Sequence, residues 1–162
     1  MNTSTLDRVL NGLMQRYLDR VPDVAAILGV MQQEGLIDAP EAIQNDHIAF
    51  RTMGVPQLGI QSLEKIFLHH GYTRQDAYDF AAKKLNAYWY APPTPAHPRI
   101  FISELRVPEL SPAARQIIHS YTDEVAHDPV LDLDLDDWQA VDDFLHRGLW
   151  RLPTSSDFTR LQ

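Results

Sequence analysis

The sequence contains no cysteine among its 162 residues. Disulfide bonds, thiolate metal ligands and cysteine nucleophiles are therefore excluded. No apolar run reaches the roughly 18 residues that a membrane-spanning helix needs. The N-terminus, residues 1–4, has neither the basic start nor the apolar core of an export signal. We therefore expect a cytoplasmic protein that has no membrane partner.

Positively charged residues are also scarce, since the sequence has 14 Lys and Arg residues but 22 Asp and Glu residues. Nine of these acids lie in residues 123–143, which contain no Lys or Arg, and the rest of the chain is close to electrical balance. A nucleic-acid partner is disfavoured, since binding to phosphates needs a basic surface. Asp132, Asp134 and Asp136 alternate along this segment but lack the glycine and glutamate of an EF-hand loop. We interpret the segment as a solvated acidic surface, with cation binding as the alternative.

The apolar residues change their spacing along the chain, and this change predicts the fold. Residues 1–40 show helical spacing, interrupted at Pro22, and predict two amphipathic helices. Residues 46–107 predict the order strand, helix, strand, strand, strand. In the C-terminal segment, residues 110–162, further helices are predicted from residue 112, in the acidic segment and over residues 138–149, whereas residues 153–162 show no clear pattern. We therefore predict a single α+β domain over residues 1–162, built from N-terminal helices, one βαβββ module and C-terminal helices.

The predicted strand over residues 46–52 carries the strongest functional signal. Alternate residues of a strand share one face, so His47, Ala49 and Arg51 should point the same way. At a rise of about 3.3 Å per residue, the His47 and Arg51 backbones lie roughly 13 Å apart. A neutral imidazole can bind Fe(II), Zn or Mn, and a guanidinium at that distance can contact the far carboxylate of a metal-bound dicarboxylate. A hydrogen-bonded structural histidine is the alternative.

Two blocks of sequence resemble the 2-oxoadipate dioxygenase/decarboxylase family. They are residues 45–52 (NDHIAFRT) and residues 98–105 (PRIFISEL). Shorter matches follow the family's order at residues 59–60, 63–64, 70–72, 83–85, 87–89, 92–93 and 150–153. The resemblance covers most of residues 5–153.

The resemblance implies an Fe(II) enzyme of the vicinal-oxygen-chelate, or glyoxalase-like, superfamily. Such an enzyme uses O2 to convert 2-oxoadipate, a small 2-oxo dicarboxylic acid, to 2-hydroxyglutarate and CO2, a step of lysine catabolism. In the family two His and one Glu hold the metal. The first of these His residues matches His47, and the substrate-binding Arg of the same motif matches Arg51.

Members of the family usually continue into a second module with an Asn-His motif and a late Glu, and this sequence ends at Gln162 before either. The resemblance therefore implies an incomplete ligand set. We expect the first half of a longer two-module protein, whose paired sheets form a metal-binding cup. Glu104 is a further candidate metal ligand, because some members of the superfamily place a Glu on the last strand of the module. A structural ion pair with a nearby Lys or Arg is the alternative for Glu104.

Two other functions stay open at this point. The chain could be a non-catalytic binding or assembly module, because an open half-cup exposes a sheet face and an edge. It could also form a glyoxalase-like homodimer, in which two His47 and two Glu104 side chains share one metal. A simple hydrolase is disfavoured, since the sequence contains no Gly-x-Ser-x-Gly elbow, no cysteine and no His-Glu-x-x-His motif.

Overall fold

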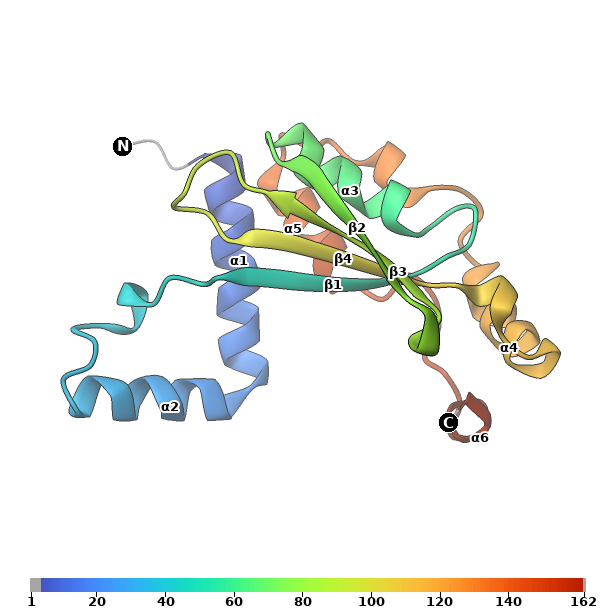
Figure 1. Ribbon diagram of the computed structural model, residues 1–162, viewed down its shortest axis with the longest axis horizontal. Coiled ribbons are helices and arrows are strands. Elements are labelled where there is room, and N and C mark those ends of the chain that lie inside the picture. Colours follow the sequence, from blue (N-terminus) through green and yellow to red (C-terminus); the bar gives the residue numbers. More distant parts are fainter. Residues whose placement is uncertain (1–3, 162) are drawn as a thin grey trace.

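A computed structural model describes residues 4–161, apart from the side chain of Glu41, and shows a four-stranded sheet with helices packed behind it (Figure 1). The helices are α1 (Thr5–Arg20), α2 (Pro22–Gln33), α3 (Ile60–His69), α4 (Pro112–Thr122), α5 (Trp138–His146) and α6 (Ser155–Leu161). The strands are β1 (His47–Met53), β2 (Thr73–Phe80), β3 (Leu85–Ala91) and β4 (Arg99–Leu105). The predicted α+β class is confirmed, and α6 is a helix that the sequence pattern did not indicate.

The strands lie in the order β1-β4-β3-β2, so β1 and β2 form the two edges of the sheet. β1 pairs in parallel with β4, whereas β4–β3 and β3–β2 are antiparallel neighbours. Antiparallel neighbours can be joined by short turns, but a strand that enters a parallel pair needs a longer crossover, and α3 lies in that connection. The βαβββ order predicted for residues 46–107 is thereby confirmed.

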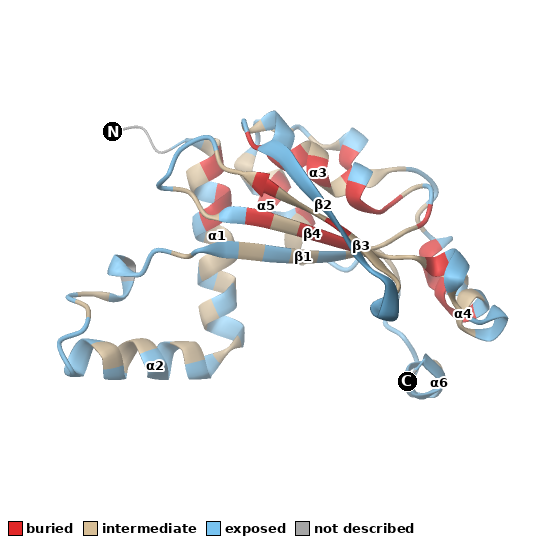
Figure 2. Cartoon of the chain, in the orientation of Figure 1, coloured by how far each residue is buried: buried red, intermediate tan, exposed pale blue. Residues whose placement is uncertain are grey.

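One face of the sheet packs against α1, α3 and α5, which lie behind it in Figure 1. Figure 2 shows buried residues on β3, on β4 and on these helices, whereas the edge strands are mostly exposed or intermediate. The largest fully buried apolar side chains are Tyr90, Phe67, Ile66, Ile100, Ile102, Val9, Val107 and Val141. Hydrophobic burial therefore stabilises one side of the sheet and leaves the other free for polar residues. No helix among the described residues has the length and apolar character needed to cross a membrane.

A buried carboxylate links α3 to the sheet. Glu64 of α3 is buried, and its Oε2 accepts a hydrogen bond of 2.7 Å from the Tyr90 hydroxyl. Arg74 of β2 lies 3.4 Å from Oε1 of Glu64 and stacks over the Tyr88 ring. Burial raises the pKa of Tyr90 well above its ordinary value, and the Glu64 carboxylate adds to the increase. Tyr90 therefore stays protonated and keeps its role as a donor.

The acidic segment between α4 and α5 is mostly irregular, with one short 3-10 turn at Pro129–Asp132, so the prediction of further helix there is wrong. Asp128 accepts a hydrogen bond of 2.6 Å from the Ser62 hydroxyl and forms an ion pair with Lys65, both on α3. Aspartate side chains compete for backbone N–H groups and favour caps and turns over helix interiors. The segment therefore follows the surface of α3 instead of coiling on itself.

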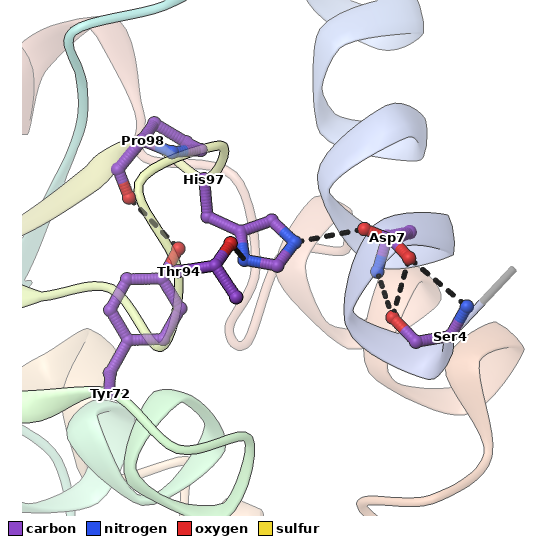
Figure 3. Close-up of polar contacts among 6 residues, drawn as sticks. All are labelled: Ser4, Asp7, Tyr72, Thr94, His97 and Pro98. Carbon is purple, nitrogen blue, oxygen red and sulfur yellow. Dashed lines mark hydrogen bonds and ion pairs between the residues drawn. The ribbon is translucent and has the colours of Figure 1, made fainter.

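The loop between β3 and β4 is attached to α1 by His97, as Figure 3 shows. Nε2 of His97 lies 2.9 Å from Oδ1 of Asp7, and Nδ1 lies 3.1 Å from the Thr94 hydroxyl. Asp7 also completes the capping box of α1 with Ser4. The same carboxylate thus caps a helix and holds the loop that leads into β4.

Replacing Asp7 by asparagine should reduce stability near neutral pH and matter less in acid. The hydrogen bond from His97, followed by that from Ser4, lowers the pKa of Asp7 from its ordinary value of 3.8. The contribution is present above the ordinary value and is lost as the pH falls through the lower folded-state value. Urea denaturation between about pH 2 and pH 7 should show the wild type and Asp7→Asn converging on acidification. Asp19→Asn, which replaces an exposed aspartate of the same helix, is the matched control.

α1 and α5 approach each other closely at Gly12. A Cβ atom added to Gly12 would lie 2.3 Å from Oδ1 of Asp142 on α5. Asp142 is buried and forms an ion pair of 2.7 Å with Arg16. A larger residue at position 12 would therefore separate the helices or break this ion pair.

Gly12→Ala should lower the free energy of unfolding by up to about 2 kcal/mol, because overpacking costs about 1–3 kcal/mol and helix propensity returns roughly 1 kcal/mol. Gly29→Ala in α2 is the matched control, since no atom lies within 4 Å of its added Cβ. The control should raise stability by about 0.5–1 kcal/mol. Urea denaturation measures both variants, and shifts in the same direction would contradict the packing argument.

Candidate metal and substrate site

β1 places His47, Ala49 and Arg51 on the face of the sheet opposite the core. The three residues are exposed and alternate with partly buried Ile48 and Phe50, as the period of two requires. The prediction that His47 and Arg51 share a face is therefore confirmed. Both sit on a strand of the scaffold, which positions side chains more rigidly than a loop does.

The imidazole of His47 is held through one ring nitrogen. Its Nδ1 lies 3.0 Å from Oδ2 of Asp46, and Oδ1 of Asp46 accepts a hydrogen bond of 2.8 Å from Arg99. The hydrogen bond with His47, and then the positive charge of Arg99, lowers the pKa of the Asp46 carboxyl. An ionised carboxylate only accepts, so Nδ1 of His47 donates, and in the neutral imidazole Nε2 then carries the lone pair.

His47 borders an open hollow of about 540 Å³ on the uncovered face. The hollow is lined by Asp46, His47, Asp76, Tyr78, Trp89, Arg99, Ile100 and Phe101. Tyr78 and Phe101 lie with ring centroids 5.7 Å apart, and the Trp89 indole donates a hydrogen bond of 3.1 Å to Asp76. The hollow therefore combines an aromatic wall with charged groups next to a histidine that is 58% exposed.

Arg51 and Arg99 lie on the same face of the sheet but differ in their ion pairing. Arg99 is ion-paired with Asp46 at 2.8 Å. Arg51 is exposed, and none of the described side chains forms a hydrogen bond or ion pair with its guanidinium. Its five donors are therefore free to bind an anion that enters from the open side.

Glu104 lies on the opposite side of the sheet from His47. β1 and β4 pair with His47 opposite Arg99, so Thr52 is opposite Glu104 and both face the helices. Oε2 of Glu104 accepts a hydrogen bond of 2.8 Å from the backbone N–H of Ile60, the first residue of α3. The sequence offered Glu104 as a further candidate metal ligand, but the structure places it away from His47, because the two residues have opposite parity in this register.

Glu104 acts instead as the cap that α3 lacks in its own sequence. The N-cap residue of α3 is Gly59, which has a φ of 86° and no side chain that could accept a hydrogen bond. A second hollow of about 500 Å³ lies beside Glu104, bordered by the start of α3 and by helix-facing residues such as Asn86 and Tyr88. His47 does not line this hollow, and Tyr78 borders both hollows.

The described residues bring one candidate metal ligand to the open face. A facial triad needs three ligands, and residues 4–161 contain no group of three or more His, Asp or Glu side chains placed to hold a metal ion. His47, with a fixed Nδ1 and a free Nε2, suits the role of one such ligand. The described residues therefore offer one ligand of such a triad.

Sequence reasoning missed Asp46 and Arg99 as partners of His47. Asp46 precedes His47 directly, so adjacency was a usable signal. Arg99 is distant along the chain, and only the β1–β4 register brings it opposite His47. Trp89, which we include in the aromatic wall, alternates with the fully buried Tyr90 and carried no separate signal.

The fold belongs to the glyoxalase-like class. A solved structure from Ralstonia eutropha JMP134, assigned by its description to the glyoxalase superfamily, is similar with a TM-score of 0.72 at 18% identity. The similarity covers 98% of this chain and 56% of that chain. At this identity the match shows the βαβββ architecture alone.

Matches at higher sequence identity show the family to which this chain belongs. The sequence model of the family described as 2-oxoadipate dioxygenase/decarboxylase matches residues 9–162. A chloroplastic 2-oxoadipate dioxygenase/decarboxylase of Arabidopsis thaliana is 33% identical over 94% of this chain and 41% of its own length. The structure of the hydroxyglutarate synthase of Oryza sativa, solved with 2-oxoadipate, matches with a TM-score of 0.77 and 34% identity over 94% of this chain and 49% of that chain. The chain belongs to the 2-oxoadipate dioxygenase/decarboxylase family, and it spans about half the length of these relatives or less.

Glu104→Ala should lower the free energy of unfolding by about 0.5–2 kcal/mol, the usual loss when a helix N-cap acceptor is removed. Glu104→Gln should lose less, because its amide oxygen still accepts from the Ile60 N–H. Urea denaturation measures stability, and NMR of the His47 ring reports the open face. A shift of the His47 ring signals in Glu104→Ala as large as that of the Ile60 amide would contradict the separation of the two faces.

Proposed function

We propose that this chain supplies the first module of a metal-dependent dioxygenase/decarboxylase that acts on a small 2-oxo dicarboxylic acid such as 2-oxoadipate. In this proposal His47 is one ligand of the metal, and Arg51 binds the carboxylate of the substrate that is remote from the metal. The overall reaction would consume O2 and convert 2-oxoadipate to 2-hydroxyglutarate and CO2.

The placement of His47 and Arg51 carries the proposal. Both side chains lie on the uncovered face of one rigid strand, and each keeps a functional group without a partner among the described residues. His47 presents the Nε2 lone pair, and Arg51 presents a guanidinium. Their backbones are roughly 13 Å apart, a separation that leaves space for a metal and a short dicarboxylate between two inward-reaching side chains.

The free guanidinium of Arg51 suits an acid with two anionic ends. One end of a 2-oxo acid can chelate a metal through its oxo and carboxylate oxygens, and the guanidinium of Arg51 can hold the other end with a forked pair of hydrogen bonds. The rice relative was solved in complex with 2-oxoadipate, which has this chemistry. The aromatic wall of Tyr78, Phe101 and Trp89 would shield the intervening methylene groups from water.

A divalent metal, Fe(II) in this proposal, would act as a Lewis acid with open positions for the oxo acid. His47 would hold it through Nε2. The other ligands would come from polypeptide beyond these residues, in line with relatives that are about twice as long. The homodimer alternative with two His47 and two Glu104 ligands loses its support, because Glu104 lies on the other face and caps α3.

Titration of the 15N-labelled chain with 2-oxoadipate tests the role of Arg51. We expect saturable shifts of backbone amides along β1 and β4, and at least about tenfold weaker binding in Arg51→Met, since hydrogen bonds to charged groups contribute about 1.5–3 kcal/mol. Arg20→Met, an exposed arginine of α1, is the matched control.

2-Oxohexanoate, which has the same chain length but no distal carboxylate, should bind the wild type as weakly as 2-oxoadipate binds Arg51→Met. Equal affinity of the wild type for the two acids would contradict the role of Arg51.

The chain alone should release no CO2 from 2-oxoadipate in the presence of Fe(II) and O2, because one histidine cannot hold the metal in a defined geometry. Trapped CO2 and chromatography of 2-hydroxyglutarate measure the reaction. Sustained turnover that His47→Ala abolishes would contradict the half-site part of the proposal, since it would show that these residues form a complete site.

A further inference from the structure

We propose that Asp46 and Arg99 are positioning residues, which hold the His47 imidazole in the tautomer that has its proton on Nδ1 and its lone pair on Nε2. The proposal deepens the function proposed above, on which its purpose rests. Its geometry does not depend on the identity of the metal or of the substrate.

The three side chains form an unbroken chain of hydrogen bonds. Arg99 donates to Oδ1 of Asp46 at 2.8 Å, and Oδ2 of Asp46 lies 3.0 Å from Nδ1 of His47. The backbone N–H of Arg99 also donates to the carbonyl oxygen of Asp46 at 3.0 Å. Asp46 is therefore fixed to β4 at two points, and each of its carboxylate oxygens has its own partner.

This arrangement specifies both the tautomer and the direction of the ring. A carboxylate that is anchored on one oxygen cannot rotate freely, so its second oxygen offers a fixed acceptor to Nδ1. Ligating histidines generally donate their second ring nitrogen to a carboxylate or carbonyl, and loss of that partner typically costs 10–100-fold in metal affinity or activity. Asp46 is in place to provide this acceptor.

Other histidines of the chain meet aspartates differently. Four of them approach the carboxylate through Nε2 instead of Nδ1, namely His69, His97, His127 and His146. His119 uses Nδ1 and lies 3.3 Å from Asp123, but no second group within residues 4–161 holds the Asp123 side chain. Asp7 and Asp142 are also anchored, by Ser4 and by Arg16, but they meet His97 and His146 through Nε2. Among the described residues, an anchored carboxylate meets Nδ1 at His47, and His119 is the comparison in which the carboxylate is not anchored.

The arrangement contributes little to stability. Asp46 and Arg99 are 72% and 56% exposed, and ion pairs at such positions are worth little because water screens them. Loss of either positioning residue should therefore change the tautomer of the His47 ring and leave the free energy of unfolding nearly unchanged.

Long-range 1H–15N NMR of the histidine rings, at about pH 9 where an imidazole is neutral, tests the proposal. In the wild type, His47 should be found as the Nδ1–H tautomer. Asp46→Ala should shift it toward Nε2–H, Asp46→Asn should restore part of the wild-type pattern through its amide oxygen, and Arg99→Met should give an intermediate result. Asp123→Ala, the control, should change His119 and leave His47 as it is.

Zn(II) titration followed at the His47 ring signals gives the second readout. We expect Asp46→Ala to weaken binding at His47 by about 10–100-fold. A wild-type His47 with Nε2–H, or an Asp46→Ala variant with unchanged tautomer and Zn(II) binding, would overturn the proposal. Because 2-oxoadipate is absent from both measurements, this failure is distinct from failure of the substrate role of Arg51.

Discussion

The parallel pairing of β1 with β4 is the constraint on which the rest of this structure depends. It joins two segments that are far apart along the chain and places His47 opposite Arg99. Since side chains alternate between faces, this one register decides every neighbour along both strands. A shift by one residue would bring Glu104 to the face of His47 and would leave the first backbone N–H of α3 without its carboxylate. The register thus decides at once the partners of the candidate ligand and the capping of the crossover helix.

The two faces of the sheet meet opposite physical demands. The face behind the sheet is covered by helices, and its buried Glu64 carboxylate is paired with the Tyr90 hydroxyl. The open face carries an exposed histidine, a free guanidinium and aromatic rings around a hollow of about 540 Å³. A strand that contributes to both faces is well suited to a site, because its buried side chains hold the backbone while its exposed ones stay available. The chain therefore presents part of a reaction site on a rigid support.

Much of the fold and part of the site could be predicted before the structure was known. Periodicity was sufficient for the helices near the N-terminus and for the βαβββ order, because burial of one face leaves a repeating pattern in the sequence. It failed in the acidic segment, where aspartates bind to α3 instead of forming a helix, and at α6, which Tyr121 fastens through a 2.7 Å hydrogen bond to Asp157. These are polar contacts between residues that are far apart along the chain, and such contacts produce no periodic pattern in the sequence.

For the site, the sequence by itself determined that His47 and Arg51 share one face of a strand, because the alternation of side chains is a local property of extended backbone. The family motif around them is likewise contained in the sequence. Only the tertiary structure decided that Glu104 lies on the other face and caps α3, that Arg99 anchors Asp46, and that Trp89 lines the hollow beside His47. Each of these outcomes depends on which strands pair and in which register, and that choice is made by the packing of the whole chain.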